Sequence, residues 1–151
     1  MADYQFGKGA GDVLFEGDVR FVLSRTKRIR QVWSGEDRLV TLRASDGFFT
    51  LGIKGAERIH RHFPAPLLRV VVVDDAVPFV SQGKTAFAKH IVSVDPALRA
   101  GDEVLITDRN DNLIATGQLL LSPQEVMATG QGPGVNVRSG ILKEFTVFER
   151  A

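Results

Sequence analysis

The chain has 151 residues, 44% of them hydrophobic and 25% charged, and its mean hydropathy is zero. This composition suits one medium domain or two small ones, and it excludes a disordered chain because the net charge is only +1. With no cysteine, the chain has no disulfide framework, no thiolate nucleophile and no Cys-ligated zinc.

The first segment, residues 1–68, predicts a small mixed domain. Its expected elements are a helix over 10–16, strands over 28–34, 38–44 and 48–51, and a helix over 55–63. Gly35-Glu36-Asp37 is suited to a hairpin turn between the first two strands, and Asp46-Gly47 makes the next turn. The prolines Pro64 and Pro66 stop the last helix, so we place the domain boundary just after them, between residues 68 and 69.

The second segment, residues 69–151, predicts a small β-barrel with little helix. An apolar run over 67–74 is typical of a strand buried on both faces. Further strands are expected over 91–94, 103–108, 113–121 and 135–138 and within 141–148, with helical turns over 77–82 and 96–99. Residues 84–90 predict either a short helix or an irregular segment. Turns are expected at Gly101-Asp102, at 110–112 and at Ser139-Gly140, and such frequent turns between short strands are typical of a barrel.

Charge is distributed unevenly along the chain. Up to Val73 there are 12 bases and 8 acids, whereas the rest carries 7 bases and 10 acids. This asymmetry indicates either a polyanionic partner for the first half or a solvated surface with uneven charge. The sequence shows neither an apolar run long enough for a membrane span nor a signal-peptide pattern, so we expect a cytoplasmic protein.

The stretch VSQGKTAF, residues 80–87, contains a Gly-Lys-Thr like the one that ends a phosphate-binding loop. Such a loop needs another glycine five residues before Gly83, because backbone amides cradle the phosphates. Position 78 is instead a proline, which also removes an amide. A second glycine-rich stretch, 130–134, precedes a strand-like run and not a helix, so it predicts a turn. We therefore expect no nucleotide cofactor.

The histidines and paired acids do not combine into a catalytic or metal site. His60 and His62 lie two apart on an expected helix and face different directions, whereas metal-binding pairs lie three or four apart. Asp74 and Asp75 could act as acid and base, yet acids at the end of a buried strand are more often turn formers or helix caps. We expect no catalytic residue and no metal.

A basic run, Arg25-Thr-Lys-Arg-Ile-Arg30, leads into the second expected element. On a strand, Arg28 and Arg30 would share one face with Val32, and Ile29 would lie on the other. Because phosphate contacts come chiefly from Arg and Lys, Arg28 and Arg30 are RNA-binding candidates. The alternative is a hairpin edge protected by charge.

Several ordered motifs carry a resemblance to a known family. Residues 69–148 contain, in order, a valine-rich strand, a short helix, Gly83 with apolar residues at every fourth place after it, Gly101-Asp102-x-Val104 and Ala115-x-Gly117. This order resembles the PUA domain, an RNA-binding pseudobarrel. FVSQGKTAFAKHIV, RAGDEVLI and GVNVRSG are most similar to the PUA region of archaeal tRNA-guanine transglycosylase and archaeosine synthase. YQFGKGAG, SRTKRIRQV and LVTLRASDGFFTLGIKGAERIH resemble the small domain that precedes PUA in those enzymes. A catalytic barrel of several hundred residues has no room in this chain.

The resemblance implies an α+β fold, in which a small α/β N-terminal domain is followed by a PUA-type β pseudobarrel. It also implies that RNA lies against the helix and strand of the glycine motif, with the late strand nearby. The RNA-binding candidates at matching positions are Gly83, Lys84, Thr85, Phe87, Lys89, His90 and Arg138. Phe87 is expected either in the barrel core or stacked on an unpaired base. Lys89-His90 departs from the Pro-Gly of many PUA domains.

Three functional hypotheses follow. The first is a non-catalytic RNA-binding protein whose partner is tRNA. The second is an accessory subunit that docks tRNA for a separate tRNA-modifying enzyme of the archaeosine pathway. The third, a self-contained enzyme using Asp74, Asp75 or the histidines, is the least supported because no catalytic constellation can be assembled.

Overall fold

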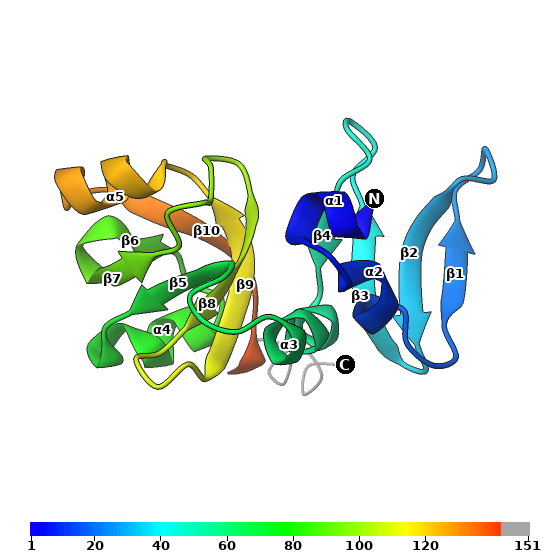
Figure 1. The fold of residues 1–151 in the computed structure, drawn as a ribbon, viewed down its shortest axis with the longest axis horizontal. Helices are drawn as coiled ribbons and strands as arrows, with labels where there is room; N and C mark the ends of the chain where they lie inside the picture. Colours follow the sequence, from blue (N-terminus) through cyan, green and yellow to red (C-terminus); the bar gives the residue numbers. More distant parts are fainter. Residues whose placement is uncertain (143–151) are drawn as a thin grey trace. The chain divides into compact units, whose positions relative to one another are not determined.

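A computed structural model describes residues 1–142 of the chain (Figure 1). The chain divides into two compact units, Met1–Phe63 and Pro64–Ala151, and each is considered by itself. Both units combine helices with an antiparallel or mixed sheet, so the expected α+β class is confirmed.

Unit 1 is a four-stranded antiparallel sheet with three short helices (Figure 1). Its elements are α1 (Ala2–Phe6), α2 (Ala10–Leu14), β1 (Arg20–Leu23), β2 (Ile29–Ser34), β3 (Asp37–Leu42), β4 (Phe49–Leu51) and α3 (Ile53–His62). The strands follow one another in the order β1-β2-β3-β4, and α3 packs on β3 and β4. The predicted hairpin, the strand near residue 50 and both predicted helices are confirmed, whereas α1 and β1 were not predicted.

Close backbone contacts hold the helices of unit 1 in place. At Gly55 a Cβ atom would overlap the carbonyl group of Leu39, so only glycine lets α3 approach β3 this closely. At the other end of the unit, the N–H groups of Gly11 and Gly9 donate to the Asp3 carboxylate at 2.7 and 3.2 Å. These two hydrogen bonds, the first above all, lower the pKa of Asp3 and join α1 to α2.

Unit 2 is a curled six-stranded sheet with the strand order β6-β10-β9-β8-β5-β7. Its elements are β5 (Arg69–Val72), η1 (Asp74–Ala76), α4 (Val77–Ser81), β6 (Ala86–Phe87), η2 (Ala88–His90), β7 (Ile91–Val94), β8 (Glu103–Thr107), β9 (Leu113–Leu119), α5 (Pro123–Thr129) and β10 (Pro133–Gly140). β5 and β8 run parallel, and the other pairs are antiparallel. Apolar side chains of these strands form one buried cluster, which includes Val72, Val104, Ile106, Leu119 and Val135.

Two local expectations in unit 2 are wrong, and a third lies largely outside the described residues. The helical turn expected over 96–99 is a non-helical turn, in which the Asp95 carboxylate accepts the N–H groups of Leu68 and Ala97 at 2.8 and 3.0 Å. The turn expected at Ser139-Gly140 belongs to β10. Residues 141 and 142 are helical, and the rest of the closing strand expected within 141–148 lies outside the described residues.

Helix α5 was not predicted, although the sequence contains its start signal. The Ser122 hydroxyl accepts the N–H of Glu125 at 3.2 Å, and the Glu125 carboxylate accepts the N–H of Ser122 at 3.0 Å. This reciprocal capping box, with Pro123 at the first helical position, fixes where the helix begins. Gly130, with a φ of 58°, ends it in the left-handed conformation.

Candidate nucleic-acid interface

The Gly-Lys-Thr motif forms a tight turn between α4 and β6. The Gly83 N–H donates to the Val80 carbonyl at 2.9 Å, and the Lys84 N–H donates to the Phe79 carbonyl at 3.2 Å. Gly83 has a φ of 93°, which L side chains rarely adopt. The glycine therefore reverses the chain and leaves the Lys84 side chain exposed at the surface.

This glycine turn lies against the end of β10. At Gly140 a Cβ atom would overlap the Ser81 carbonyl and lie 2.9 Å from the Gly83 nitrogen, so the two segments touch through their backbones. The following strand β6 also pairs with β10, with Phe87 opposite Pro133 and Ala86 opposite Val135. β10 thus supports both the glycine turn and the strand after it.

The side chains after the turn alternate between core and surface. Ala86 and Ala88 are buried, whereas Lys84, Phe87 and Lys89 are exposed. The expectation that Phe87 lies in the barrel core is therefore wrong: 43% of it is exposed, because the two alanines occupy the inward positions. An exposed aromatic ring between two lysines can contact a base and its phosphates together.

The other candidates from this segment are partly covered. Thr85 and His90 are half-buried, and the His90 carbonyl accepts the N–H of Val73 at 2.9 Å, which ties η2 to the end of β5. Thr85 and His90 therefore affect the shape of the surface around Lys84, Phe87 and Lys89 more than its charge.

Arg138 is held by an ion pair. Its Nη1 donates to both carboxylate oxygens of Glu103, at 2.6 and 2.5 Å, and the Glu103 side chain is only 4% exposed against 30% for Arg138. The pairing of β10 with β9 shifts register between Val137 and Ser139, where Arg138 lies. The Glu103 carboxylate therefore offsets much of the charge that Arg138 could offer to a phosphate.

Phe79 was not among the predicted site residues, yet it is 56% exposed on α4. Its carbonyl accepts the hydrogen bond from Lys84, so its backbone is part of the glycine turn. The next two residues, Val80 and Ser81, are both buried, which leaves Phe79 on the outer side of α4, and no local sequence pattern signalled this.

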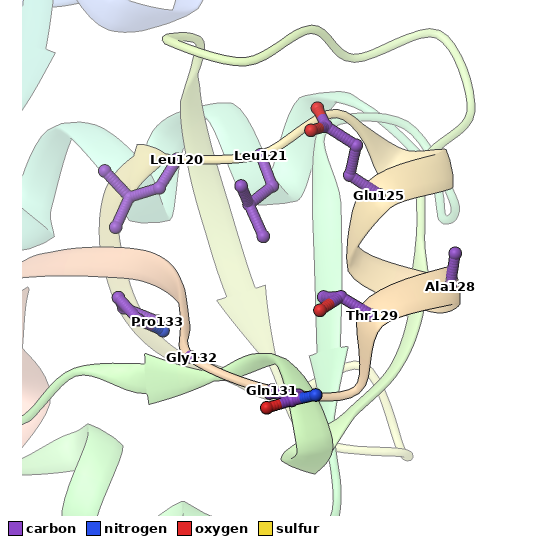
Figure 2. A pocket seen from close by; sticks show the side chains of 8 residues that line it. All are labelled: Leu120, Leu121, Glu125, Ala128, Thr129, Gln131, Gly132 and Pro133. Carbon is purple, nitrogen blue, oxygen red and sulfur yellow. The ribbon is translucent and has the colours of Figure 1, made fainter.

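An apolar hollow of about 560 Å³ lies beside β6 (Figure 2). It is open to the surface and is lined by the segment after β9, by α5 and by the start of β10: Leu120, Leu121, Glu125, Ala128, Thr129, Gln131, Gly132 and Pro133. Its rim adjoins the segment that carries the exposed Phe87, because Pro133 pairs with Phe87 and the Gly132 carbonyl accepts the N–H of Ala88 at 2.9 Å.

Arg28 and Arg30 lie in unit 1, at the start of β2, and both are exposed. The pairing of β1 with β2 shifts register there, and Ile29 faces Leu23. Cross-strand partners share a face of the sheet, and Leu23 lies two residues after Phe21, on the same face of β1. Ile29, the partner of Leu23, therefore lies on the same face as Phe21 and as Val32, the partner of Phe21. The expectation that Ile29 and Val32 lie on opposite faces is therefore wrong.

The remaining candidates do not form a chemical site. Asp74 and Asp75 are exposed in η1, and the ring of His62 packs edge-on against Phe63 with 4.6 Å between the ring centroids. Within residues 1–142, no group of three or more His, Cys, Asp or Glu side chains could hold a metal ion. Nor does that part of the chain contain a helix of the length and apolarity that crossing a membrane requires.

Comparison with known proteins matches both units. Residues 1–66 match the model of the patch-forming domain C2 of tRNA-guanine transglycosylase, and residues 68–141 match the PUA domain. The tRNA-guanine(15) transglycosylase of Methanothermobacter thermautotrophicus is 46% identical over 93% of this chain and 22% of its own length. That of Thermococcus kodakarensis is 48% identical over 95% of this chain and 24% of its own length. The chain thus spans less than a quarter of these relatives.

Solved structures share the fold. A hypothetical protein of Pyrococcus horikoshii OT3 superposes with a TM-score of 0.71 over 95% of this chain and 89% of its own, at 18% identity. The Nop10–Cbf5 complex of an archaeal box H/ACA ribonucleoprotein matches at 28% identity and a TM-score of 0.50, over 56% of this chain and 26% of its own. The chain is therefore a PUA-domain protein that resembles the C-terminal region, domain C2 followed by PUA, of archaeal tRNA-guanine transglycosylases.

Proposed function

We propose that this chain binds RNA, and tRNA in particular, through the glycine turn, β6 and η2 of its PUA domain, without catalysing a reaction itself. The observation that carries the proposal is the exposed row Lys84, Phe87 and Lys89 on a backbone held by β10. Lysines at a fixed spacing contact successive phosphates, and a glycine at the turn lets an RNA backbone approach closely.

Two further features suit RNA with unpaired nucleotides. Phe79 and Phe87 offer exposed rings on which splayed bases can stack. The apolar hollow beside β6 is large enough for a nucleobase, and Pro133, which lines it, is the strand partner of Phe87. We propose that an unpaired end or loop of the RNA lies across this surface, with Gly83, Thr85 and His90 shaping it and Arg138 adding a weaker contact.

Unit 1 adds a second contact in this proposal. Arg28 and Arg30 are exposed on the β1–β2 hairpin and can meet phosphates of the same RNA. The domain boundary is proposed between residues 68 and 69, and the protein is proposed to work in the cytoplasm, where tRNA is modified.

A second candidate function is an accessory tRNA-docking subunit of a separate tRNA-modifying enzyme. One observation favours it: residues 1–66 match domain C2 of tRNA-guanine transglycosylase, in addition to the PUA match over residues 68–141. In this role the chain would hold the tRNA on which the separate enzyme acts.

The test is binding of the whole chain to a fluorescein-labelled tRNA transcript, followed by anisotropy, with a DNA duplex of equal charge as the control. We expect tRNA to bind more tightly than the duplex, with an affinity that falls by about a thousandfold or more between 50 and 200 mM salt if six or more phosphates are contacted. Equal affinity for both nucleic acids, or no binding at low salt, would overturn the proposal. Crosslinking to cellular RNA followed by sequencing then identifies the RNA.

A further inference from the structure

The first strand of unit 1 carries exposed apolar side chains. Phe21, Leu23 and Ile29 are 51%, 53% and 44% exposed, respectively. Phe21 and Leu23 are two residues apart on β1, and Leu23 pairs with Ile29 on β2, so the three form one continuous patch. Single exposed apolar residues are ordinary on protein surfaces, but a contiguous row of three indicates an interaction site.

The patch continues the core face of the sheet. Phe21 pairs with Val32, Val32 with Val40, and Val40 with Leu51. The last three of these residues are buried in the core of unit 1. The same face is therefore covered over β2, β3 and β4 and left open over β1, where unit 1 itself provides nothing to cover it.

The backbone of β1 is also open along its outer side. β1 is the end strand of its sheet (Figure 1), and it pairs only with β2 among the described strands. An edge strand of this kind presents unpaired N–H and C=O groups to which a further strand can add. Arg20 is the only charged residue on β1, and the strand contains no proline.

The charge of the β1–β2 hairpin indicates which kind of partner would bind β1. Residues 20–34 contain five bases and no acid. A second copy of the chain, paired through β1, would bring two such hairpins together and would be repelled. RNA would use the charge, but it would gain nothing from Leu23, Ile29 and an open strand edge. An acidic polypeptide would use the basic charge, the exposed apolar side chains and the open strand edge together.

We propose that β1 is a docking edge for an extended, acidic segment of another protein. The segment adds to the sheet as a fifth strand, packs alternate apolar side chains on Phe21, Leu23 and Ile29, and places carboxylates near the basic hairpin. The docking edge adjoins Arg28 and Arg30, which we also propose as RNA contacts, but it shares no residue with the PUA-domain row Lys84, Phe87 and Lys89, so it can fail while that contact holds.

The probe for this docking is the synthetic heptapeptide EVEVEVE, titrated into the whole isotope-labelled chain and followed by NMR. We expect shift changes centred on residues 20–23 and 29, together with slower amide exchange on β1. Leu23→Glu should weaken binding by about tenfold or more, since it removes an apolar contact and adds a repelling charge. The matched control is Leu67→Glu, at another exposed leucine, which should leave binding unchanged.

Two modified peptides keep the test independent of how the variants fold. An N-methylated EVEVEVE cannot form the strand hydrogen bonds and should bind about tenfold more weakly. The lysine analogue KVKVKVK should not bind. Equal binding of either peptide, shifts elsewhere on the chain, or slower amide exchange on β1 when the protein alone is concentrated or an RNA oligonucleotide is added would each overturn the proposal.

Discussion

Replacing Lys84 and Lys89 together with alanine tests the proposed RNA interface most directly. Both side chains are exposed, Lys84 on the glycine turn and Lys89 on η2, so their removal should leave the fold intact. Arg138, in contrast, is already paired with Glu103. If each lysine contacts one phosphate, the slope of log K against log salt should fall by about 0.9 for each lysine, or about 1.8 in total. Extrapolated to about 0.1 M salt, this corresponds to a loss of roughly 60-fold in affinity.

The measurement is anisotropy with labelled tRNA at several salt concentrations between about 50 and 300 mM. Arg109→Ala is the matched control, because Arg109 is an exposed base of the same unit on the turn after β8. Its slope should be unchanged. A double lysine variant that keeps the parent slope, or loses no more than Arg109→Ala, would refute the assignment of these lysines to phosphates while leaving other RNA contacts open to test.

Three other predictions follow from the described contacts. Arg138→Ala should lower the free energy of unfolding in urea by about 2–3 kcal/mol, because it leaves the buried Glu103 carboxylate without this partner. It should change the slope of log K against log salt less than the double lysine variant does, and a stable variant with a large loss of slope would contradict this. Ala128→Trp should fill the hollow and weaken binding to tRNA with an unpaired 3′ end more than to a blunt RNA duplex, and equal losses would show that no base enters there. Hydrogen bonds lower the pKa of Asp3 in the folded protein, so the Asp3 carboxylate stabilises the fold above its pKa in the unfolded chain, and this stabilisation is lost as pH falls through the lower pKa of the folded state. Asp3→Asn should remove that part of the pH dependence of stability, as measured by thermal unfolding, and carboxyl NMR of the parent chain should show the lowered pKa.

Local signals in the sequence predicted most of the strands. The hairpin turn at residues 35–37 and the valine run before Asp74 depend on residues close together in the chain, and both are confirmed. Strand β1 was missed because its four residues, Arg20-Phe-Val-Leu23, do not alternate between polar and apolar. Helix α5 was missed although Ser122 and Glu125 have the spacing of a capping box.

The candidate site was predictable in position but not in detail. The glycine motif indicated where the turn lies, yet β6 has only two residues, too few for a period of two to show which side chain faces the core. The exposure of Phe87 therefore required the structure. The pairing of Arg138 with Glu103 joins residues 35 apart in the chain, and no local pattern signals such a contact.

The strand order of unit 2 also bears on how the protein is made. β6 pairs only with β10 among the described strands, and more than 40 residues separate the two. A chain emerging from the ribosome therefore displays its glycine motif long before the supporting strand exists, and distant pairings of this kind form late. The surface that we propose for RNA should be assembled last, so a nascent or prematurely ended chain that stops before Pro133 would carry Lys84 and Lys89 without the strand that supports them.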